Sequence, residues 1–427
     1  MTNETQASSK IDRIIPYAVI VALCVFGWFA VRTQIGSMLG ELTPPTRDNA
    51  ADVAELSSNL APLDPRPRWL AAMTLRQSFS PEDIDRSVVF LEESVRLAPY
   101  DFRTWIDLSR GYEQAERYDE AERALQRSIQ LAPAYALPRW HMGNFLLRQD
   151  RVEEAKAELK RATETSSTYR DQVYALAWDY FGRDPAQVEA LASDSADARA
   201  NLARFYAQRE SGRDALRIWN QLSPQQKNYY WFIAGPTARR LYETGFVREA
   251  LAIARDVGLA RDAQQETVNN GGFEKSIGDH TETLFGWMIF RNESKFDALP
   301  DSQVKSEGSR SLKVSFRNFV KPSLYNIGQI VTVAGGRAYR LTFKLRTDNL
   351  RSGGPPYLQI AAVKTNAILA ASEPFPTGST DWQEIAVDFT VPDDVEGVEI
   401  RTVRVGCGDE CPISGTFWYD DFRLIGQ

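Results

Sequence analysis

Hydrophobic and polar residues follow three different patterns along the 427-residue chain. Residues 14–31 form an apolar run without a charged side chain. From residue 67 to residue 262, apolar positions recur at the three- and four-residue spacing of amphipathic helices. Beyond residue 266, apolar and polar residues alternate, which is the period of strands with one buried face. The patterns predict a membrane-spanning helix, an α-helical domain and a β-domain, in that order.

The apolar run predicts a transmembrane helix over residues 14–32. Eighteen helical residues extend about 27 Å, which is close to the hydrocarbon thickness of a bilayer. Lys10 and Arg13 precede the run and Arg32 follows it, and this charge bias favours a cytoplasmic segment 1–13. A cleaved signal peptide is the alternative, although bulky residues end the run where a cleavage site needs small ones. We therefore expect a single-pass protein of a bacterial inner membrane, with most of the chain in the periplasm.

Residues 33–66 are expected to be a linker between the membrane and the helical domain. Several prolines interrupt this segment, including Pro44, Pro45 and Pro62, and such segments act as spacers. A short helix near residues 52–60 is an open alternative.

The helical domain repeats at one fixed interval along the chain. Its clearest unit runs from Phe102 to Pro133 and predicts two helices separated by a turn. One repeat length relates small, apolar and proline positions: Ser87, Ala121 and Ala155; Leu91, Leu125 and Leu159; and Pro99 and Pro133. Over residues 68–167 this register resembles the tetratricopeptide repeat family. The resemblance implies an α-solenoid of helical hairpins, which we expect to continue as degenerate repeats to give a domain over residues 67–262.

A solenoid of this kind commonly holds an extended peptide or a partner helix in its concave groove. A protein partner is therefore expected. Tyr229, Tyr230, Trp231 and Phe232 are a sharper candidate for a partner site, because four consecutive aromatic residues cannot all face one buried stripe of a helix. Burial between hairpins is the alternative.

The alternating pattern beyond residue 266 predicts about eight strands in a two-sheet sandwich. Leu341, Phe343 and Leu345 illustrate it, since charged or hydroxyl residues separate them. The phase of the pattern slips in residues 398–405, which predicts a bulge near Arg401. In the last strand the pattern places Trp418, Phe422 and Leu424 on one face. The fold class is therefore multidomain α and β.

Landmarks in this domain occur in a familiar order. They are Asn270-Gly271-Gly272-Phe273-Glu274, Gly286-Trp287, Gly308-Ser309-Arg310-Ser311-Leu312 and Trp418-Tyr419-Asp420-Asp421-Phe422. Residues 267–427 resemble the jelly-roll carbohydrate-binding modules attached to xylanases, and the domain is assigned to residues 266–427. The resemblance implies a structural calcium ion held in part by Glu274 and Asp420. The alternative is that Asp420 caps a strand end by accepting hydrogen bonds from backbone N–H groups.

Glycan binding needs exposed aromatic rings with polar groups nearby. Tyr325, Tyr357 and Trp287 are the candidates. Trp287 occupies a framework position of the resembling family, and core packing is the alternative for it. The two tyrosines could equally cover an edge of the sandwich.

Cys407 and Cys411 frame a short loop and can form a disulfide, which would persist outside the cytosol. Metal binding is the rival, but two further ligands are missing. The chain carries a net charge of −7 and only two histidines, which argues against nucleic acid as a partner and against a zinc site. No phosphate-binding loop, nucleophile motif or cofactor motif occurs, so an enzyme is not expected.

These features favour a non-enzymatic, membrane-anchored scaffold in bacterial cell-envelope or exopolysaccharide assembly. The repeats would bind a protein and the sandwich would bind polysaccharide. A pure protein–protein adaptor whose sandwich does not bind sugar is the alternative. A glycan-active enzyme ranks third, because no pair of carboxylates in a cleft can be identified.

Overall fold

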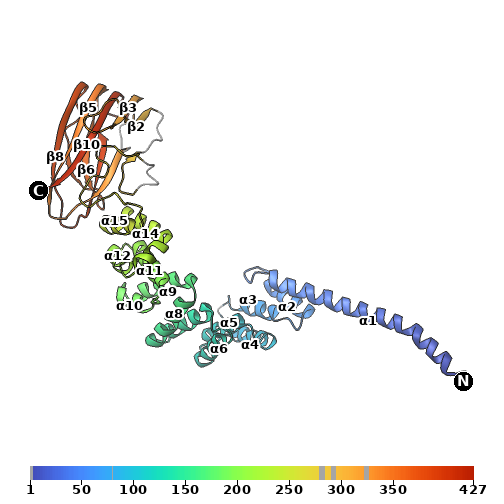
Figure 1. Ribbon diagram of the computed structural model, residues 1–427. Coiled ribbons are helices and arrows are strands. Elements are labelled where there is room, and N and C mark those ends of the chain that lie inside the picture. The colour runs from blue at the N-terminus through green and yellow to red at the C-terminus, as the bar shows by residue number, and fades with distance from the viewer. Residues whose placement is uncertain (1–2, 79, 278–283, 290–294, 322–326) are drawn as a thin grey trace. The chain divides into compact units, whose positions relative to one another are not determined.

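The computed structural model describes residues 3–78, 80–277, 284–289, 295–321 and 327–427. The chain divides into two compact units, Met1–Ser193 and Asp194–Gln427. In the described ranges, fifteen helices precede ten strands, and the strands form two antiparallel sheets. The structure confirms the expected order of helical hairpins followed by a β-sandwich (Figure 1).

The first unit begins with one long helix, α1 (Asn3–Leu42), drawn in blue in Figure 1. Residues Val19–Leu42 are long and apolar enough to cross a membrane, a test that a signal sequence near an N-terminus also passes. Phe26 and Trp28 are exposed. This candidate span overlaps the predicted one, 14–32.

The segment expected to be a linker, 33–66, differs from that expectation because most of it is helical. Helix α1 continues to Leu42, and α2 (Ala50–Leu60) packs against both α1 and the following helix. The Ser57 hydroxyl donates a hydrogen bond to the carbonyl oxygen of Gly36 over 2.5 Å. Prolines suggested a spacer, but Pro44, Pro45 and Pro62 lie between packed helices, and the short helix left open near residues 52–60 is present as α2.

Helical hairpins make up the rest of the first unit. They are α3 (Pro65–Leu75), α4 (Pro81–Leu97), α5 (Phe102–Gln114), α6 (Tyr118–Leu131), α7 (Ala136–Arg148), α8 (Val152–Thr165), α9 (Ser167–Tyr180) and α10 (Pro185–Ala190). Side-chain caps at Asp64, Ser80 and Asp101 fix the starts of α3, α4 and α5. The small and apolar positions that recur at the repeat interval are buried in each helical hairpin. Gly143 lets α7 and α8 approach, since a Cβ there would lie 2.6 Å from the Leu159 side chain.

The second unit contains five more helices and the sandwich. The helices are α11 (Ala196–Gln208), α12 (Gly212–Trp219), α13 (Pro224–Tyr229), α14 (Trp231–Glu243) and α15 (Val247–Asp256). The last hairpin packs directly on the β-domain. The Arg248 guanidinium donates to the carbonyl oxygen of Val333 over 2.7 and 3.1 Å, and the rings of Tyr242 and Phe285 meet edge to face.

The sandwich is built from two five-stranded antiparallel sheets. Sheet A has the order β1 (Met288–Ile289), β4 (Ile327–Thr332), β9 (Gly397–Arg404), β6 (Pro356–Ala362), β7 (Ile368–Ala371). Sheet B has the order β2 (Phe296–Asp301), β3 (Ser311–Phe319), β10 (Ile413–Gly426), β5 (Ala338–Ser352), β8 (Gly378–Thr390). Aromatic residues fill the space between the sheets, among them Phe343, Phe375, Phe417, Tyr419 and Phe422.

Two details of strand phase predicted from the sequence are wrong. Strand β9 pairs with β6 without a register shift, so there is no bulge near Arg401. Thr402 occupies a core position and shares a hydrogen bond of 2.9 Å with the hydroxyl of Tyr419. This polar residue interrupts the apolar alternation of β9 without changing its phase, and in the sequence it looked like a bulge.

The irregularity lies in β10 instead, between Asp420 and Arg423, where Asp421 has φ 52°. It reverses the alternation of the strand. Trp418 therefore lies on the outer face of sheet B, bonded to Asp301, whereas Phe422 enters the core. Trp418 and Phe422 therefore do not share a face, contrary to the prediction.

Candidate functional site

The outer face of sheet A carries a polar cluster centred on Arg401. Because Leu358 and Ile360 face the core, strand alternation places Tyr357 and Gln359 on the outer face. The Arg401 guanidinium donates to Gln359 Oε1 over 2.9 and 2.7 Å and to Asn366 Oδ1 over 2.8 Å.

Glu399 completes this cluster with an ion pair of 3.0 Å to Arg401. The Arg401 side chain is 12% exposed, so its guanidinium is held in one direction by the surrounding oxygens. Such a fixed set of donors and acceptors beside an aromatic ring can orient the hydroxyl groups of a sugar. We call Tyr357, Gln359, Asn366, Glu399 and Arg401 the sheet A cluster.

The three aromatic residues predicted as glycan platforms have different surroundings. Tyr357 is half-buried and lies opposite Val403 of β9 on the outer face. Trp287 is 3% exposed and packs between Phe273 and Phe422, so its environment is that of a core residue. Tyr325 lies outside the described residues. Only Tyr357 is therefore placed in the sheet A cluster.

The outer face of sheet B is covered by ion pairs. Arg340 binds Asp388 over 2.7 Å, and Lys344 binds Glu384 over 3.3 Å. Trp418 lies under the cations of Lys313 and Arg346, each within 6 Å of its ring. This face resembles an ordinary solvated surface more than a ligand platform.

Glu274 and Asp420 both accept hydrogen bonds from the loop 306–310. The Glu274 carboxylate accepts hydrogen bonds from the backbone N–H groups of Ser309 and Arg310, and also from the Ser309 hydroxyl. Asp420 Oδ2 accepts from the backbone N–H groups of Ser306 and Glu307 over 2.8 and 3.1 Å. Burial raises the pKa of the Asp420 carboxyl above its ordinary value, against the effect of these donors.

The chemistry of this pair fits a hard cation in part. Carboxylate oxygens are the donors that Ca²⁺ prefers, and Asp420 is buried. Among the described residues, however, no three His, Cys, Asp or Glu side chains gather as a metal cluster. An ion here would need backbone carbonyl oxygens as most of its ligands. Calcium stays a prediction, tested by a rise in melting temperature on adding Ca²⁺ that Asp420→Asn abolishes and that Asp388→Asn, on the outer face of sheet B, retains.

Cys407 and Cys411 form a disulfide with a Cα–Cα distance of 5.4 Å. The buried Arg404 guanidinium donates to Cys411 Sγ and to the carbonyl oxygens of Gly354 and Lys321. The disulfide and Arg404 together fix the loop that leads into β10.

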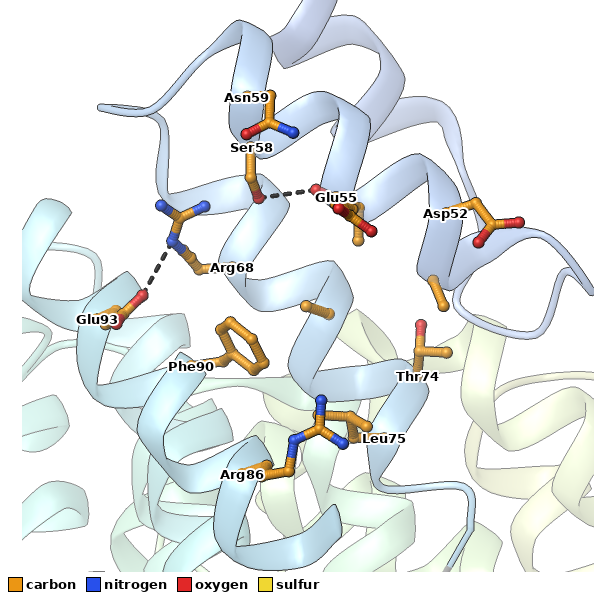
Figure 2. Close-up of a pocket in the computed structure, with 13 residues that line it drawn as sticks. Asp52, Glu55, Ser58, Asn59, Arg68, Thr74, Leu75, Arg86, Phe90 and Glu93 are labelled. Carbon is orange, nitrogen blue, oxygen red and sulfur yellow. Dashed lines mark hydrogen bonds and ion pairs between the residues drawn. The ribbon is translucent and has the colours of Figure 1, made fainter.

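A cavity of about 470 Å³ lies between α2, α3 and α4 in the first unit. Figure 2 shows Phe90 and Leu75 at its base and charged groups of both signs around it, with Arg68 bound to Glu93 over 2.9 Å. A similar cavity of about 510 Å³ lies between α6, α7 and α8. Ion pairs neutralise its walls, including Arg139 with Glu158 and Arg151 with Glu122.

A third cavity, of about 580 Å³, is lined by the first helices of successive hairpins, α5 and α7, together with Arg76 at the end of α3. We call it the first-helix cavity. Trp140, His141 and Asn144 of α7 line one side, and Arg110, Glu113 and Gln114 of α5 line the other; Arg148 completes it. Helices α5 and α7 contact each other directly, as do the inner helices of a curved solenoid.

The aromatic run 229–232 is largely exposed. Tyr229, Trp231 and Phe232 expose 71%, 61% and 53% of their surface, and Tyr230 is half-buried. Burial between hairpins is therefore wrong for three of the four residues. A tight turn separates α13 from α14 here, and the chain direction changes before the rings can reach the core.

Sequence reasoning identified Tyr357 but missed the other four residues of the sheet A cluster and the arginines of the first-helix cavity. Gln359 and Asn366 carry no motif, and they meet Arg401 only through strand pairing. The arginines had a usable signal. Arg76 and Arg110 are separated by one repeat length, and they therefore occupy the same position of successive hairpins.

Two family models match parts of the chain. Residues 112–177 match the tetratricopeptide repeat, and residues 265–404 match a carbohydrate binding domain. No curated protein matches the chain. The matches agree with both resemblances drawn from the sequence, and both families are binding modules without catalytic groups of their own.

Several solved structures resemble parts of the chain at low identity. A CBM4 module is 21% identical over 38% of this chain and 99% of its own, with a TM-score of 0.28. The Clostridium thermocellum xylanase 10B CBM22-1–GH10 structure, complexed with xylohexaose, is 13% identical over 37% of this chain and 28% of its own, with a TM-score of 0.25. MamA AMB-1 is 18% identical over 37% of this chain and 92% of its own, with a TM-score of 0.29.

Proposed function

We propose that this chain, which joins tetratricopeptide repeats to a carbohydrate-binding-like sandwich, is a non-enzymatic scaffold anchored in a membrane by α1. In this proposal the repeats bind a protein partner and the sandwich binds polysaccharide, during assembly or export of a bacterial envelope glycan. The observation that carries the proposal is the presence of both binding modules behind one apolar helix.

The sheet A cluster is the proposed glycan surface. Tyr357 supplies an aromatic ring, and Arg401 with its bonded oxygens supplies fixed donors and acceptors. The outer face of sheet B is a weaker candidate, because its ring, Trp418, is 5% exposed and lies under the cations of Lys313 and Arg346. Removing the Tyr357 ring should remove about 60 Å² of apolar contact with the ligand, which corresponds to a loss of about 1.5 kcal/mol of binding free energy.

Affinity electrophoresis of the full chain in detergent, in gels containing xylan or mixed-linkage β-glucan, tests this role. Retardation by one of these glycans is expected, with about tenfold weaker binding for Tyr357→Ala. Tyr229→Ala is the matched control, because Tyr229 is an exposed tyrosine on α13, away from the sheets. Equal loss of binding in both variants, or no retardation by any glycan tested, contradicts the assignment.

A protein–protein adaptor is the second candidate. The limited exposure of Arg401 and the core position of Trp287 favour it, because both reduce the surface open to a sugar ring. A partner that co-purifies with the full chain and stays bound to Tyr357→Ala, with no glycan binding in the same preparation, would favour the adaptor over the scaffold.

The membrane orientation is also part of the proposal. A cytoplasmic segment 1–13 would place the second unit, and the part of the first unit that follows α1, in the periplasm, where the disulfide of Cys407 and Cys411 would persist. Protease added to spheroplasts should then degrade both units. Protection of the units until the membrane is lysed would reverse the orientation.

A further inference from the structure

Positive charge is concentrated in the first-helix cavity. Arg76, Arg110 and Arg148 line it, whereas Glu113 is the single carboxylate among its lining residues. The cavity between α6, α7 and α8 has three arginines facing three glutamates and is neutral by comparison. A cavity with an excess of guanidinium groups favours a ligand of negative charge.

Arg76 and Arg148 are bonded to a neighbouring helix, and Arg110 and Arg148 have exposed guanidinium groups. Arg76 Nε donates to Gln114 Oε1 over 2.8 Å, which ties α3 to α5. Arg148 donates to both oxygens of Glu113, which ties α7 to α5. The side chains of Arg110 and Arg148 are each 53% exposed, so their guanidinium groups can donate hydrogen bonds to a further carboxylate.

The nearest acidic group outside the cavity lining is not closely paired with Arg110. Asp107, the other carboxylate close to Arg110, lies 4.0 Å from its guanidinium and accepts a hydrogen bond from the Trp69 indole. Burial raises the pKa of Asp107. His141 is neutral at pH 7, because burial first, and then the charges of Arg110 and Arg148, lower its pKa to about 4.

We propose that the first-helix cavity binds an acidic segment of a protein partner, with Arg76, Arg110 and Arg148 pairing its carboxylates and Trp140 covering an apolar side chain between them. This deepens the proposed protein-binding role of the repeats and rests on it. Trp140 lies on the same helix as Asn144, one turn away, and is half-buried, so its ring is available on the cavity side. A volume of about 580 Å³ is suited to a few side chains rather than to a folded domain.

The test measures fluorescence polarisation of a short labelled peptide with the full chain in detergent. In the probe, glutamate and aspartate alternate with leucine; in its control peptide, glutamine and asparagine replace the acids. The acidic peptide alone is expected to bind, and Arg110→Gln and Arg148→Gln should each weaken binding about tenfold. Arg123→Gln is the matched control, since Arg123 is exposed on α6 and does not line the cavity. Raising the salt concentration should also weaken binding, because the paired groups are partly exposed.

Equal binding of the acidic and amide peptides would overturn the proposal, as would equal effects of Arg110→Gln and Arg123→Gln. Polygalacturonate, a polyanionic polysaccharide, serves as the competitor. If it binds more tightly than the acidic peptide, the ligand is a glycan and the proposed protein ligand is wrong. Arg110→Gln is the safer variant for folding, since its nearest carboxylate is 4.0 Å away.

Asn144→Trp separates this proposal from the broader one. It fills the same cavity without changing its charge. If Asn144→Trp abolishes binding of a co-purified partner while Arg110→Gln does not, the repeats bind a protein, but recognition of an acidic segment is wrong. If neither variant alters partner binding, the proposed role of the repeats falls as well.

Discussion

The contact between α1 and α2 depends on the absence of a side chain at Gly36. A Cβ added there would lie 2.8 Å from the backbone nitrogen of Ala61, from its Cβ and from the Cβ of Leu60. These atoms belong to the backbone or are joined directly to it, so they can yield only if the two helices separate. We predict that Gly36→Ala loosens the packing of α2 on α1.

The size of the effect follows from two opposed terms. Overpacking a tight contact costs about 1–3 kcal/mol, whereas alanine gains about 1 kcal/mol over glycine in the interior of a helix. The expected net loss is about 1 kcal/mol, which raises the open population of this contact about fivefold. Gly36→Leu adds volume without a further gain in propensity and should open the contact by more than about 3 kcal/mol. Gly27→Ala is the matched control on the same helix, because a Cβ at Gly27 meets nothing within 4 Å.

Hydrogen exchange of the full chain in detergent micelles, read by mass spectrometry, measures this opening. Amides in α2, which includes the buried Ala54 and Ser57, should exchange faster in Gly36→Ala and faster still in Gly36→Leu. Amides in α15 belong to the second unit and should not change. Unchanged exchange of α2 in Gly36→Leu, relative to Gly27→Ala, would show that α1 does not pack on α2.

Three further predictions concern buried and exposed side chains. Glu249 is 6% exposed, its Oε2 has no partner among the described residues, and burial raises its pKa. Between the ordinary carboxyl pKa and the raised one, the folded state therefore binds more protons than the unfolded state. The free energy of unfolding falls as pH rises through this range. Glu249→Gln should remove this fall and raise the melting temperature at pH 7. The lowered pKa of His141, about 4, predicts that its imidazole NMR signal does not titrate between about pH 5.5 and 8; a midpoint near 6.5, in a signal assigned by its loss in His141→Gln, would contradict the burial. Trp231→Ala should change unfolding free energy by less than about 0.5 kcal/mol because the ring is exposed, whereas Trp219→Ala should cost about 3–5 kcal/mol, since Trp219 is fully buried; similar losses in urea titrations of the two variants would contradict this contrast.

The sequence was sufficient for the fold wherever one period persisted. The constant repeat interval located buried positions in three successive hairpins, as Leu91, Leu125 and Leu159 illustrate. Alternation likewise located the core face of β5, where Leu341, Phe343 and Leu345 are fully buried. In both cases one physical demand, the burial of a continuous apolar face, acts on many residues at once.

The sequence was insufficient where a single local feature changed the phase. The irregularity at Asp421 reverses β10, and a one-residue change of phase moves every later side chain to the opposite face. Thr402 produced the opposite error, because its hydroxyl is satisfied by Tyr419 inside the core. Neither a bulge nor a partnered core hydroxyl leaves a pattern longer than one residue.

The candidate sites were harder to find than the fold, because fold and specificity depend on different positions of each repeat. Positions shared between hairpins, such as Ala121 and Ala155, are buried at helix–helix contacts and make the units stack. Positions that line the first-helix cavity join successive hairpins through polar side chains such as Arg76 and Gln114, so no apolar repeat marks them. At one such position, Arg76 and Arg110 are followed one repeat later by Asn144, and Arg148 supplies the positive charge of α7 one turn further on. If an acidic segment binds in this cavity, its carboxylates should therefore meet Arg76, Arg110 and Arg148, and its apolar side chain should meet Trp140.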